Sequence, residues 1–430
     1  MQFVNLTPFH SMAFQSLDNA GHYCTTVVTK VGYRIVIDPS TGKGELQLIE
    51  QEPLPLVLAD EHWDDDPQGS IKQESDLAPF KPRCDLLIAG NTYAPEGKPA
   101  DQWPVRVRLT QISSENNNLN TNNNSEQNSA STTLIDKTLY IYAPGHFHKT
   151  FFGWALKRDK NTTQIPLRWD YAFGGASKIA NPKYQQDPNQ PEWLLNEACF
   201  SNPVGCGWVD KRHQKLAQKA AQPLLQTIPA PCFFYPNEAI TEPVFIQQPK
   251  TIINAKDMQD IAKQYPCRPA GFGSVGRSWA PRVSLTGTYD EQWQQERWPL
   301  SPTDFDEHYW NAAPLDQQCA WPRPDCQLET WFLFSPELAP QGYVQMQLPG
   351  HRAFVMARLQ DNTPIPLAAN IDTVLLDTEK QQLEVVWRCR IKQNSTIKQL
   401  EARFEINPQA PLLKYESTTH QTNTTLSEAV

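Results

Sequence analysis

Alternating apolar and polar positions predict much of this chain as short β-strands. Residues 22–37 are rich in β-branched and aromatic side chains, which favours a strand. The turn sequence Asp38-Pro-Ser-Thr-Gly follows, and residues 45–50 alternate again. We therefore predict a β-hairpin in the first fifty residues.

The clearest alternation lies far along the chain. Apolar side chains occupy every second position from Leu383 to Ile391, and again from Leu400 to Ile406 after a short polar turn. This pattern is typical of strands that bury one face. We predict that the two segments pair as a sheet with one dry face. Further strands are predicted at 85–89, 103–109, 137–142, 331–334, 343–348 and 353–359.

Residues 269–314 are denser in glycine, arginine and tryptophan than the rest of the chain. The spacing of three glycines superficially resembles a nucleotide-binding loop: Gly271, Gly273 and Gly276. No convincing strand precedes them, and Pro281 argues against a long helix after them. We predict instead a tight loop that Arg277 and Trp279 clamp.

Two short helices are predicted after this loop. Thr288 and Glu291 have the spacing of a capping box, so the first helix should begin at Thr288 and stop at Pro299. The second should begin at Ser301, with Pro302 at its first position and Asp304 at its third. Side chains four residues apart share a helix face, so these helices should carry aromatic and arginine side chains together.

Five of these side chains are the candidate partner-binding residues: Tyr289, Trp293, Arg297, Trp298 and Tyr309. Tyrosine, tryptophan and arginine are the residue types enriched at interface hot spots. The alternative is that the five maintain the fold as a local core, because tryptophan buries well.

Composition favours a mainly β fold. The chain has 37 prolines and only 19 glycines, which suggests short strands and ordered, proline-punctuated loops rather than a helical bundle. We predict a β-rich α+β protein with antiparallel sheets in two packed lobes, short helices and long ordered loops rich in proline and tryptophan. Residues 1–410 would form one unit, with lobes at about 1–265 and 266–410. The Asn/Ser-rich tract 112–133 and the polar tail 416–430 are predicted to be disordered.

The net charge and the lack of targeting signals bear on where the protein is located in the cell and which classes of partner it can bind. A net charge of −9 argues against direct nucleic-acid binding. No apolar run approaches the about 20 residues that span a bilayer, and residues 1–19 lack the basic and apolar regions of a signal peptide. Nine cysteines are scattered singly without a C-x-x-C motif, which favours reduced thiols. We therefore predict a cytoplasmic protein that does not enter a membrane.

No catalytic, cofactor-binding or metal-binding residue is predicted. His146 and His148 could share one side of a strand, but no acidic or cysteine partner stands at a diagnostic spacing. Cys206 lies between two glycines. It has no local histidine or helix start to lower its pKa, which favours a packed thiol over a nucleophile.

Several longer motifs together resemble the bacterial DUF2169 family, over roughly residues 20–392. In chain order they are Lys81-Pro-Arg-Cys-Asp, Pro166-Leu-Arg-Trp-Asp-Tyr-Ala-Phe-Gly-Gly, Asn202-Pro-Val-Gly-Cys-Gly-Trp, the loop 269–282, Gly287-Thr-Tyr-Asp, Arg297-Trp-Pro-Leu and Tyr309-Trp-Asn-Ala-Ala-Pro. Members are encoded beside type VI secretion genes. The resemblance therefore implies a cytosolic adaptor or chaperone that binds a toxic effector and helps to load it onto the VgrG-type spike.

The chain departs from the family in three respects. It has an asparagine-rich insertion, it has His146-Phe-His where an arginine–tryptophan pair would be expected, and it lacks the pentapeptide repeats that follow this domain in some relatives. These departures bear on the choice of partner.

Two other functions are open. Thirteen tryptophans could form sugar platforms in a glycan hydrolase, with the acid and base drawn from Asp304, Asp306 and Glu307. A glycosidase needs two carboxyls about 5–9 Å apart in one cleft, whereas these neighbours suit a helix start. The chain could also be a secreted effector, which would be toxic when expressed alone. The aromatic and arginine motifs contain no coherent set of catalytic residues, which favours the adaptor. We therefore predict that the protein is not an enzyme.

Overall fold

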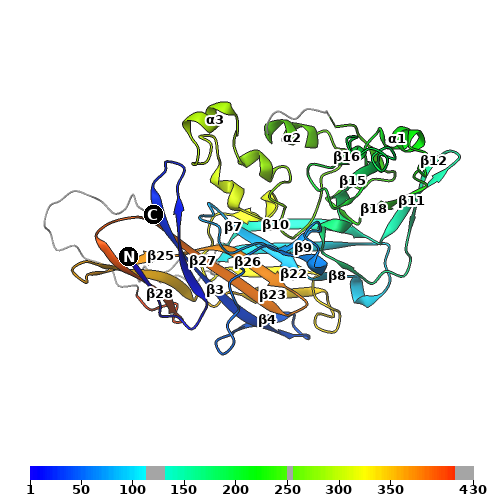
Figure 1. The fold of residues 1–430 in the computed structure, drawn as a ribbon. Helices are drawn as coiled ribbons and strands as arrows, with labels where there is room; N and C mark the ends of the chain where they lie inside the picture. The colour runs from blue at the N-terminus through cyan, green and yellow to red at the C-terminus, as the bar shows by residue number, and fades with distance from the viewer. Residues whose placement is uncertain (113–130, 249–254, 412–430) are drawn as a thin grey trace.

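The computed structural model describes residues 1–112, 131–248 and 255–411 (Figure 1). Strands make up most of its regular structure, and the α-helices are short: α1 (His213–Lys219), α2 (Ala255–Ala262) and α3 (Glu291–Glu296). None of the helices in these residues has the length and apolar character needed to cross a bilayer. The prediction of a β-rich protein with antiparallel sheets and short helices is confirmed.

A curled sheet of twelve strands is the base of the molecule. Its strands follow the order β19 (Phe233–Phe234), β10 (Ser131–Tyr142), β9 (Gln102–Ile112), β22 (Gln327–Trp331), β23 (Tyr343–Gln347), β4 (Lys43–Leu48), β3 (Tyr23–Asp38), β27 (Gln382–Lys392), β26 (Asn370–Asp377), β7 (Cys84–Ala89) and β21 (Gln318–Cys319), with β2 (Ser11–Leu17) paired to β3. Most pairs are antiparallel, while β4–β23 and β7–β26 are parallel.

Strands from distant parts of the chain alternate across this sheet. β3 pairs with β27, β9 with β22, and β7 with β26. Every one of these pairs joins a strand before residue 265 to a strand after it. The large sheet therefore does not follow the division at about residue 265 that the sequence suggested, because it joins the two portions.

The predicted N-terminal hairpin is present. β3 and β4 pair antiparallel from Tyr33 opposite Leu48 to Asp38 opposite Lys43. The turn between them is closed by Asp38, whose side chain accepts hydrogen bonds from the backbone and hydroxyl of Ser40. Local turn chemistry and alternation were sufficient here because the partner strand is the next one in sequence.

The predicted pairing of residues 383–391 with 400–406 is wrong. β27 lies between β3 and β26 in the large sheet, whereas β28 (Ile397–Glu405) belongs to a separate sheet of order β1 (Gln2–Asn5), β28, β24 (Arg352–Leu359) and β25 (Pro364–Ala368). β1 pairs with β28 in parallel. The two sheets pack together through apolar side chains of β3, β24, β27 and β28.

β27 is buried on both faces, so the expectation of one dry face also fails. Its polar positions are filled by charged side chains that find partners inside the protein. Glu384 forms an ion pair with Lys30 at 3.2 Å. Arg388 forms an ion pair with Asp372 and donates a hydrogen bond to the carbonyl of Asp76 at 2.9 Å. A buried charge is tolerated when it is paired and hydrogen-bonded, which is how an alternating strand becomes covered on its polar side.

Most of residues 145–317 lie above the large sheet in Figure 1, and we call this part the upper layer. It contains small sheets, short helices and long irregular loops. Their strands are β11 (Gly145–Thr150), β12 (Gly153–Arg158), β18 (Thr227–Ala230), β13 (Gln164–Pro166), β14 (Phe173–Gly174), β15 (Ala176–Ala180), β16 (Trp193–Ala198), β17 (Cys206–Val209) and β20 (Val244–Phe245). Two further pairs involve β8 (Asn91–Tyr93) with β13, and β5 (Glu61–His62) with β6 (Ile71–Gln73).

The described residues also contain six 3₁₀ turns: η1 (Trp63–Asp65), η2 (Pro95–Gly97), η3 (Trp169–Tyr171), η4 (Arg282–Leu285), η5 (Glu307–Trp310) and η6 (Leu315–Gln317). The largest apolar core joins the sheet to the upper layer. It brings Trp103 and Leu109 of β9 together with Trp169, Phe272 and Trp279. The upper layer is therefore fixed to the sheet by a shared core.

The tract 112–133 was predicted to be disordered, and it falls mostly outside the described residues. Its two flanks are strand: Ile112 ends β9, residues 131–133 begin β10, and Ser131 lies opposite Ile112. The predicted disordered tail, 416–430, also lies outside the described residues.

Candidate functional site

The glycine, arginine and tryptophan segment crosses the upper layer and is held down mainly by Arg282. This guanidinium donates Nε to the carbonyl of Tyr309 at 2.7 Å and Nη1 to that of Val275 at 2.7 Å. It also makes a two-pronged ion pair with Glu74, in which Nη2 to Oε2 is 2.9 Å. Arg282 is only 4% exposed. One side chain thus joins the loop, η5 and the segment before β7.

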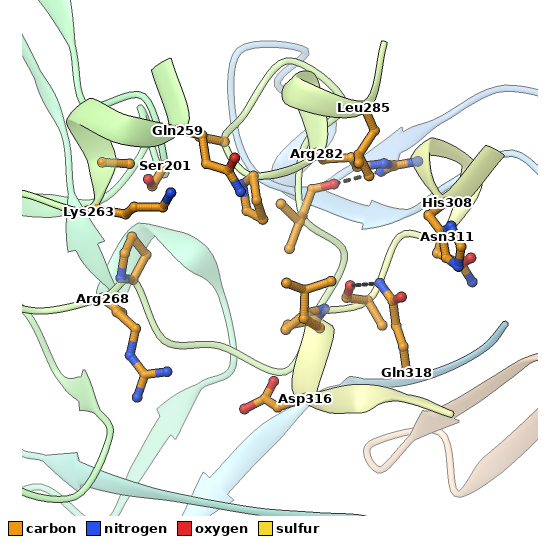
Figure 2. A pocket seen from close by; sticks show the side chains of 18 of the residues that line it. Ser201, Gln259, Lys263, Arg268, Arg282, Leu285, His308, Asn311, Asp316 and Gln318 are labelled. Carbon is orange, nitrogen blue, oxygen red and sulfur yellow. Dashed lines mark hydrogen bonds between the residues drawn. The ribbon is translucent and has the colours of Figure 1, made fainter. Parts of the chain in front are cut away.

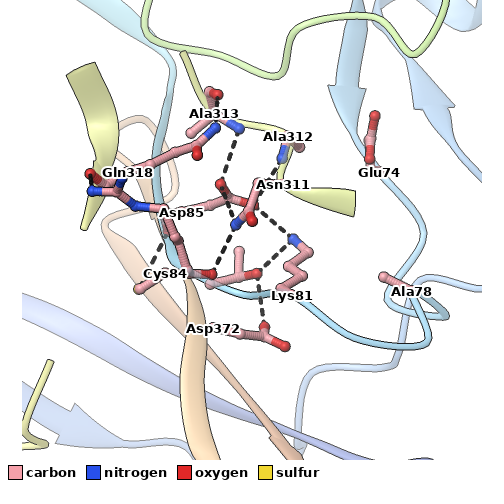
Figure 3. Close-up of polar contacts among 12 residues, drawn as sticks. Glu74, Ala78, Lys81, Cys84, Asp85, Asn311, Ala312, Ala313, Gln318 and Asp372 are labelled. Atoms are coloured by element: carbon pink, nitrogen blue, oxygen red, sulfur yellow. Dashed lines mark hydrogen bonds and ion pairs between the residues drawn. The ribbon is translucent and has the colours of Figure 1, made fainter. Parts of the chain in front are cut away.

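The far end of this segment is held by Asp85 on β7 (Figure 3). Its carboxylate accepts the backbone N–H groups of Ala312 at 2.8 Å and Ala313 at 3.2 Å, and the amide of Asn311 at 3.1 Å. Lys81 adds an ion pair at 2.9 Å. Burial alone would lower the pKa of Lys81, but Asp85 and Asp372 raise it above its ordinary value. A fully buried carboxylate with four donors is a rigid anchor.

A second buried lysine fixes the region between these anchors. Lys137 on β10 donates to the carbonyl of Gly271 at 2.7 Å, to Gln317 at 2.7 Å and to Asp316 at 2.9 Å. Burial lowers the pKa of Lys137 to about 8, although Asp316 opposes this change. The side-chain amide of Gln317 donates hydrogen bonds to the backbone carbonyls of Leu86 on β7 and of Phe272.

Tryptophan rings explain two of the three glycines in the loop, Gly276 and Gly271. A Cβ on Gly276 would lie 2.6 Å from the ring of Trp279, and one on Gly271 would lie 3.1 Å from the ring of Trp169. The two tryptophans meet edge to face with centroids 5.8 Å apart. Arg277 pairs with Asp60 at 3.0 Å. The predicted tight loop, clamped by Arg277 and Trp279, is confirmed.

Residues 286–306 leave this frame as a projecting excursion that carries α3 (Figure 1). The predicted capping box is wrong, since Asp290 caps α3 by accepting the N–H of Trp293 at 2.8 Å. Thr288 instead donates its backbone N–H and its hydroxyl to Asp304, at 2.9 and 2.8 Å. The second predicted helix start at Ser301 is also wrong, because η5 begins at Glu307 with Asp306 as its cap. In both cases an aspartate nearer the helix provides the cap.

The excursion rests on the turn between β2 and β3. Arg297 donates to the carbonyls of Asn19 and Ser301, the latter at 2.8 Å. Asn19 in turn donates its amide to the carbonyl of Phe305 at 3.0 Å. Leu300 lies against Gly21, where an added Cβ would meet it at 3.1 Å. These contacts fix the direction in which the excursion projects.

The structure divides the five candidate residues into two groups. Tyr289 and Trp298 are 57% and 68% exposed on the excursion. The other three are half-buried: Trp293 donates to the carbonyl of Leu300 at 2.9 Å, Arg297 holds the excursion as described, and Tyr309 lies 5.5 Å from the guanidinium of Arg282. Two of the five therefore face solvent, and three have contacts that maintain the fold.

A cavity of about 510 Å³ lies beside the excursion, between α2, η4 and η6 (Figure 2). Its wall includes Trp169, Tyr265 and Val275, and its polar side chains include Lys263, Arg268 and Asp316. None of the five candidate residues lines it. The sequence contained the aromatic and basic residues of this wall, but their convergence depends on contacts between distant segments.

The carboxylates considered for a hydrolase have structural contacts. Asp304 holds Thr288, Asp306 caps η5, and Glu307 forms an ion pair with Arg390. Cys206 is half-buried, and burial raises the pKa of its thiol. His146 and His148 have ring centroids 6.2 Å apart on β11. Across the described ranges no group of three or more His, Cys, Asp or Glu side chains could hold a metal ion.

Replacing Arg282 with lysine should loosen the frame beneath the excursion. We expect Arg282→Lys to lower the free energy of unfolding by about 1–3 kcal/mol, because lysine cannot reproduce the two-pronged pair and both carbonyl contacts. Urea unfolding would measure this. Arg106→Lys is the matched control, since the Arg106–Asp136 pair is about one-third exposed and should contribute little. Equal effects of the two changes would contradict the anchoring role of Arg282.

Comparison with known proteins gives one result. A family model described as an uncharacterized protein conserved in bacteria, DUF2169, matches residues 20–388. No curated protein and no solved structure matches the chain.

Proposed function

Because the chain belongs to the DUF2169 family of bacterial proteins, we propose that it is an adaptor or chaperone that binds a type VI secretion effector and helps to load it onto a VgrG-type spike. In this proposal the protein works in the cytoplasm, and it binds proteins rather than acting as an enzyme. The secretion role rests on the motifs that resemble the family, and the binding role also rests on the surface described above.

The observation that carries the binding role is the exposure of Tyr289 and Trp298 on a firmly anchored excursion. Large aromatic side chains on a projecting element bury much apolar surface when a partner covers them, and such residues are often hot spots. The excursion has a fixed base, since Arg297 and Asn19 connect it to the β2–β3 turn. A surface that is already ordered loses less conformational entropy on binding, which favours affinity.

The proposal is tested by recovering the tagged protein from its own cells while secretion is active, and identifying bound proteins by mass spectrometry. Recovery of a toxin together with a spike protein supports the adaptor. A bait that carries neither would reject it. Expression of the protein alone is a second measurement, because an adaptor should leave the host unharmed whereas a secreted toxin should not.

The double variant Tyr289→Ala/Trp298→Ala should lose the effector and keep its fold. We expect affinity for the recovered effector to fall at least tenfold, since truncation of a hot-spot aromatic costs about 2 kcal/mol or more. Biolayer interferometry would measure the affinity, and thermal unfolding should change little because both side chains are exposed.

Two control variants make this experiment specific. Tyr184→Ala removes an aromatic side chain that is 39% exposed on the turn between β15 and β16, away from the excursion, and it should bind normally. Trp293→Ala removes the half-buried ring and should destabilise the excursion itself. Normal binding by the Tyr289→Ala/Trp298→Ala protein would show that the excursion is not the contact surface.

A further inference from the structure

The hairpin of β11 and β12 ends in two phenylalanines that face solvent almost completely. Thr150 lies opposite Gly153 in the hairpin register, so Phe151 and Phe152 are the two turn residues. They are 96% and 97% exposed, the highest values among the exposed large apolar side chains of the described residues. Their rings contact one another edge to face, with centroids 5.2 Å apart.

The hairpin does not need these rings in order to fold. Neither phenylalanine is needed for the backbone of the turn, because the positive-φ position of this hairpin is taken by Gly153, with φ +132°. The hairpin is held instead by its inner face, where Phe147 is fully buried and Leu156 and Trp154 pack beside it. Trp154 also contacts Phe245 of β20, with centroids 5.9 Å apart. Two exposed aromatics at such a turn therefore indicate binding.

The charge of the hairpin points to the chemistry of the partner. Residues 145–158 contain no aspartate or glutamate, although the chain as a whole has a net charge of −9. Lys149 and Lys157 are exposed on the two strands. Lys149 lies over the ring of Trp154 at 5.2 Å, which keeps its ammonium group close to the turn. A complementary surface would combine an apolar socket for the rings with carboxylates around it.

We propose that the β11–β12 hairpin is a second docking element, which inserts Phe151 and Phe152 into an apolar socket of a partner protein bordered by acidic side chains. The hairpin then acts as a rigid two-ring anchor, and its lysines set orientation and association rate.

A protein socket fits better than the two other possible occupants. A second copy of this chain docked tip to tip would bring the lysines of both hairpins together, which is unfavourable. A membrane would have to accept β12, which is an edge strand paired only with β11 in the described part of the chain. The outer backbone groups of such a strand find no hydrogen-bond partners in hydrocarbon, whereas a protein can supply them.

The hairpin and the α3 excursion lie at opposite ends of the upper layer in Figure 1. The two elements can therefore contact different proteins at the same time, as an adaptor between cargo and spike requires. This bridging role rests on the proposed function. The docking of the hairpin does not, because it follows from exposure, turn chemistry and charge alone.

The test uses a photo-crosslinking phenylalanine analogue at position 152 in the full chain, expressed in its own cells. The control carries the analogue at Ser395, which is exposed on the turn after β27. We expect a discrete adduct from position 152 alone, joined to a single protein at apolar residues flanked by Asp or Glu. The purified partner should then bind the wild-type protein and lose at least tenfold affinity for the Phe151→Asn/Phe152→Gly variant. That variant removes only side chains that are 96% and 97% exposed, so its melting temperature should change little.

Several outcomes would overturn the proposal. They are an adduct with a second copy of this chain, an adduct with lipid, equal crosslinking from position 395, no adduct at all, or unchanged affinity of the Phe151→Asn/Phe152→Gly variant. Binding of the wild-type protein, but not of this variant, to phosphatidylglycerol vesicles would assign the rings to a membrane instead.

The hairpin proposal and the adaptor function can fail separately. Tyr289→Ala/Trp298→Ala should leave the crosslink from position 152 intact. If the crosslinked partner has no part in secretion, the hairpin proposal stands and the adaptor function fails. If toxin and spike are recovered without a crosslink, the reverse holds.

Discussion

Above pH 9 the folded protein is expected to lose stability steeply, because unfolding exposes thiols that the fold keeps protonated. Burial raises the pKa of eight of the nine cysteines: Cys24, Cys84, Cys199, Cys206, Cys232, Cys267, Cys326 and Cys389. For Cys232, Cys267, Cys326 and Cys389 the pKa rises to about 12, from an ordinary value of 9.0. In an unfolded chain these thiols would ionise near that ordinary value.

The direction of the effect follows from proton binding. Between pH 9 and 12 the folded protein holds thiol protons that the unfolded chain has released, so rising pH favours unfolding. Each such thiol contributes at most about 1.4 kcal/mol per pH unit, so the four with a pKa of about 12 give at most roughly 6 kcal/mol per unit. Lys137 opposes this, since its pKa of about 8 makes the unfolded chain bind the extra proton up to pH 10.5. Lys137 therefore cancels the pH-dependent loss of stability that about one thiol contributes.

Urea unfolding at pH 8, 9 and 10 in the presence of a reductant would measure this dependence. We expect the unfolding midpoint to fall steeply between pH 9 and pH 10. Cys232→Ala/Cys389→Ala should be less stable at pH 8 but should show a shallower fall, because two of the titrating groups are gone. A fall of the same steepness in both proteins would exclude the thiols as its cause.

Replacing Asp85 should be the most damaging single substitution at the ion pairs that hold residues 269–314. Asp85→Ala leaves the Lys81 ammonium with the hydroxyl of Thr373 as its described contact, at 2.9 Å, and leaves two buried backbone N–H groups without an acceptor. Removing one partner of a buried pair costs about 3–5 kcal/mol. We expect a loss of this size in the free energy of unfolding, together with loosening of residues 311–313.

Two comparisons make the Asp85 result interpretable. Lys81→Met should cost less, because Asp85 would keep its three donors from residues 311–313. Glu96→Ala removes a carboxylate from the Lys98–Glu96 pair, in which both side chains are more than two-thirds exposed, and should change stability little. Denaturant unfolding would rank the three variants, and protease cleavage near residue 312 would report the local loosening. If Lys81→Met were the worse of the two, the anchor would be the lysine rather than the carboxylate.

Local patterns identified the strands but did not identify their partners. Alternation and an Asp-Pro-Ser-Thr-Gly turn were enough for β3 and β4, which are consecutive and pair. The same alternation in β27 and β28 gave the wrong pair, since a period of two reports which residues share a face and not which strand lies beside them. Two polar positions of β27 are Glu384 and Arg388. Glu384 pairs with Lys30 on β3, and Arg388 pairs with Asp372 on β26. No local signal marks such a position as buried.

The candidate site shows the same limit. Tyrosine and tryptophan at 289, 293, 298 and 309 are equivalent by composition, yet Trp293 and Tyr309 are half-buried and the other two are exposed. The difference comes from two contacts that composition does not reveal: Trp293 donates to the carbonyl of Leu300 within the excursion, and Tyr309 lies against the guanidinium of Arg282. Phe151 and Phe152 were overlooked, although Phe-Phe-Gly between two alternating segments was a readable signal of an unusual hairpin turn.

The parallel pairing of β1 with β28 has a consequence for how the protein is made. Residues 2–5 lie beside residues 399–402, and β3 lies beside β27. A ribosome adding about 5–20 residues per second needs roughly 20–80 seconds to progress from the first of these strands to the last. During that interval the emerging strands lack the neighbours that will cover them. Closure of both sheets must therefore follow release of nearly the whole chain, and nascent chains are expected to depend on holding by chaperones that recognise exposed strand edges.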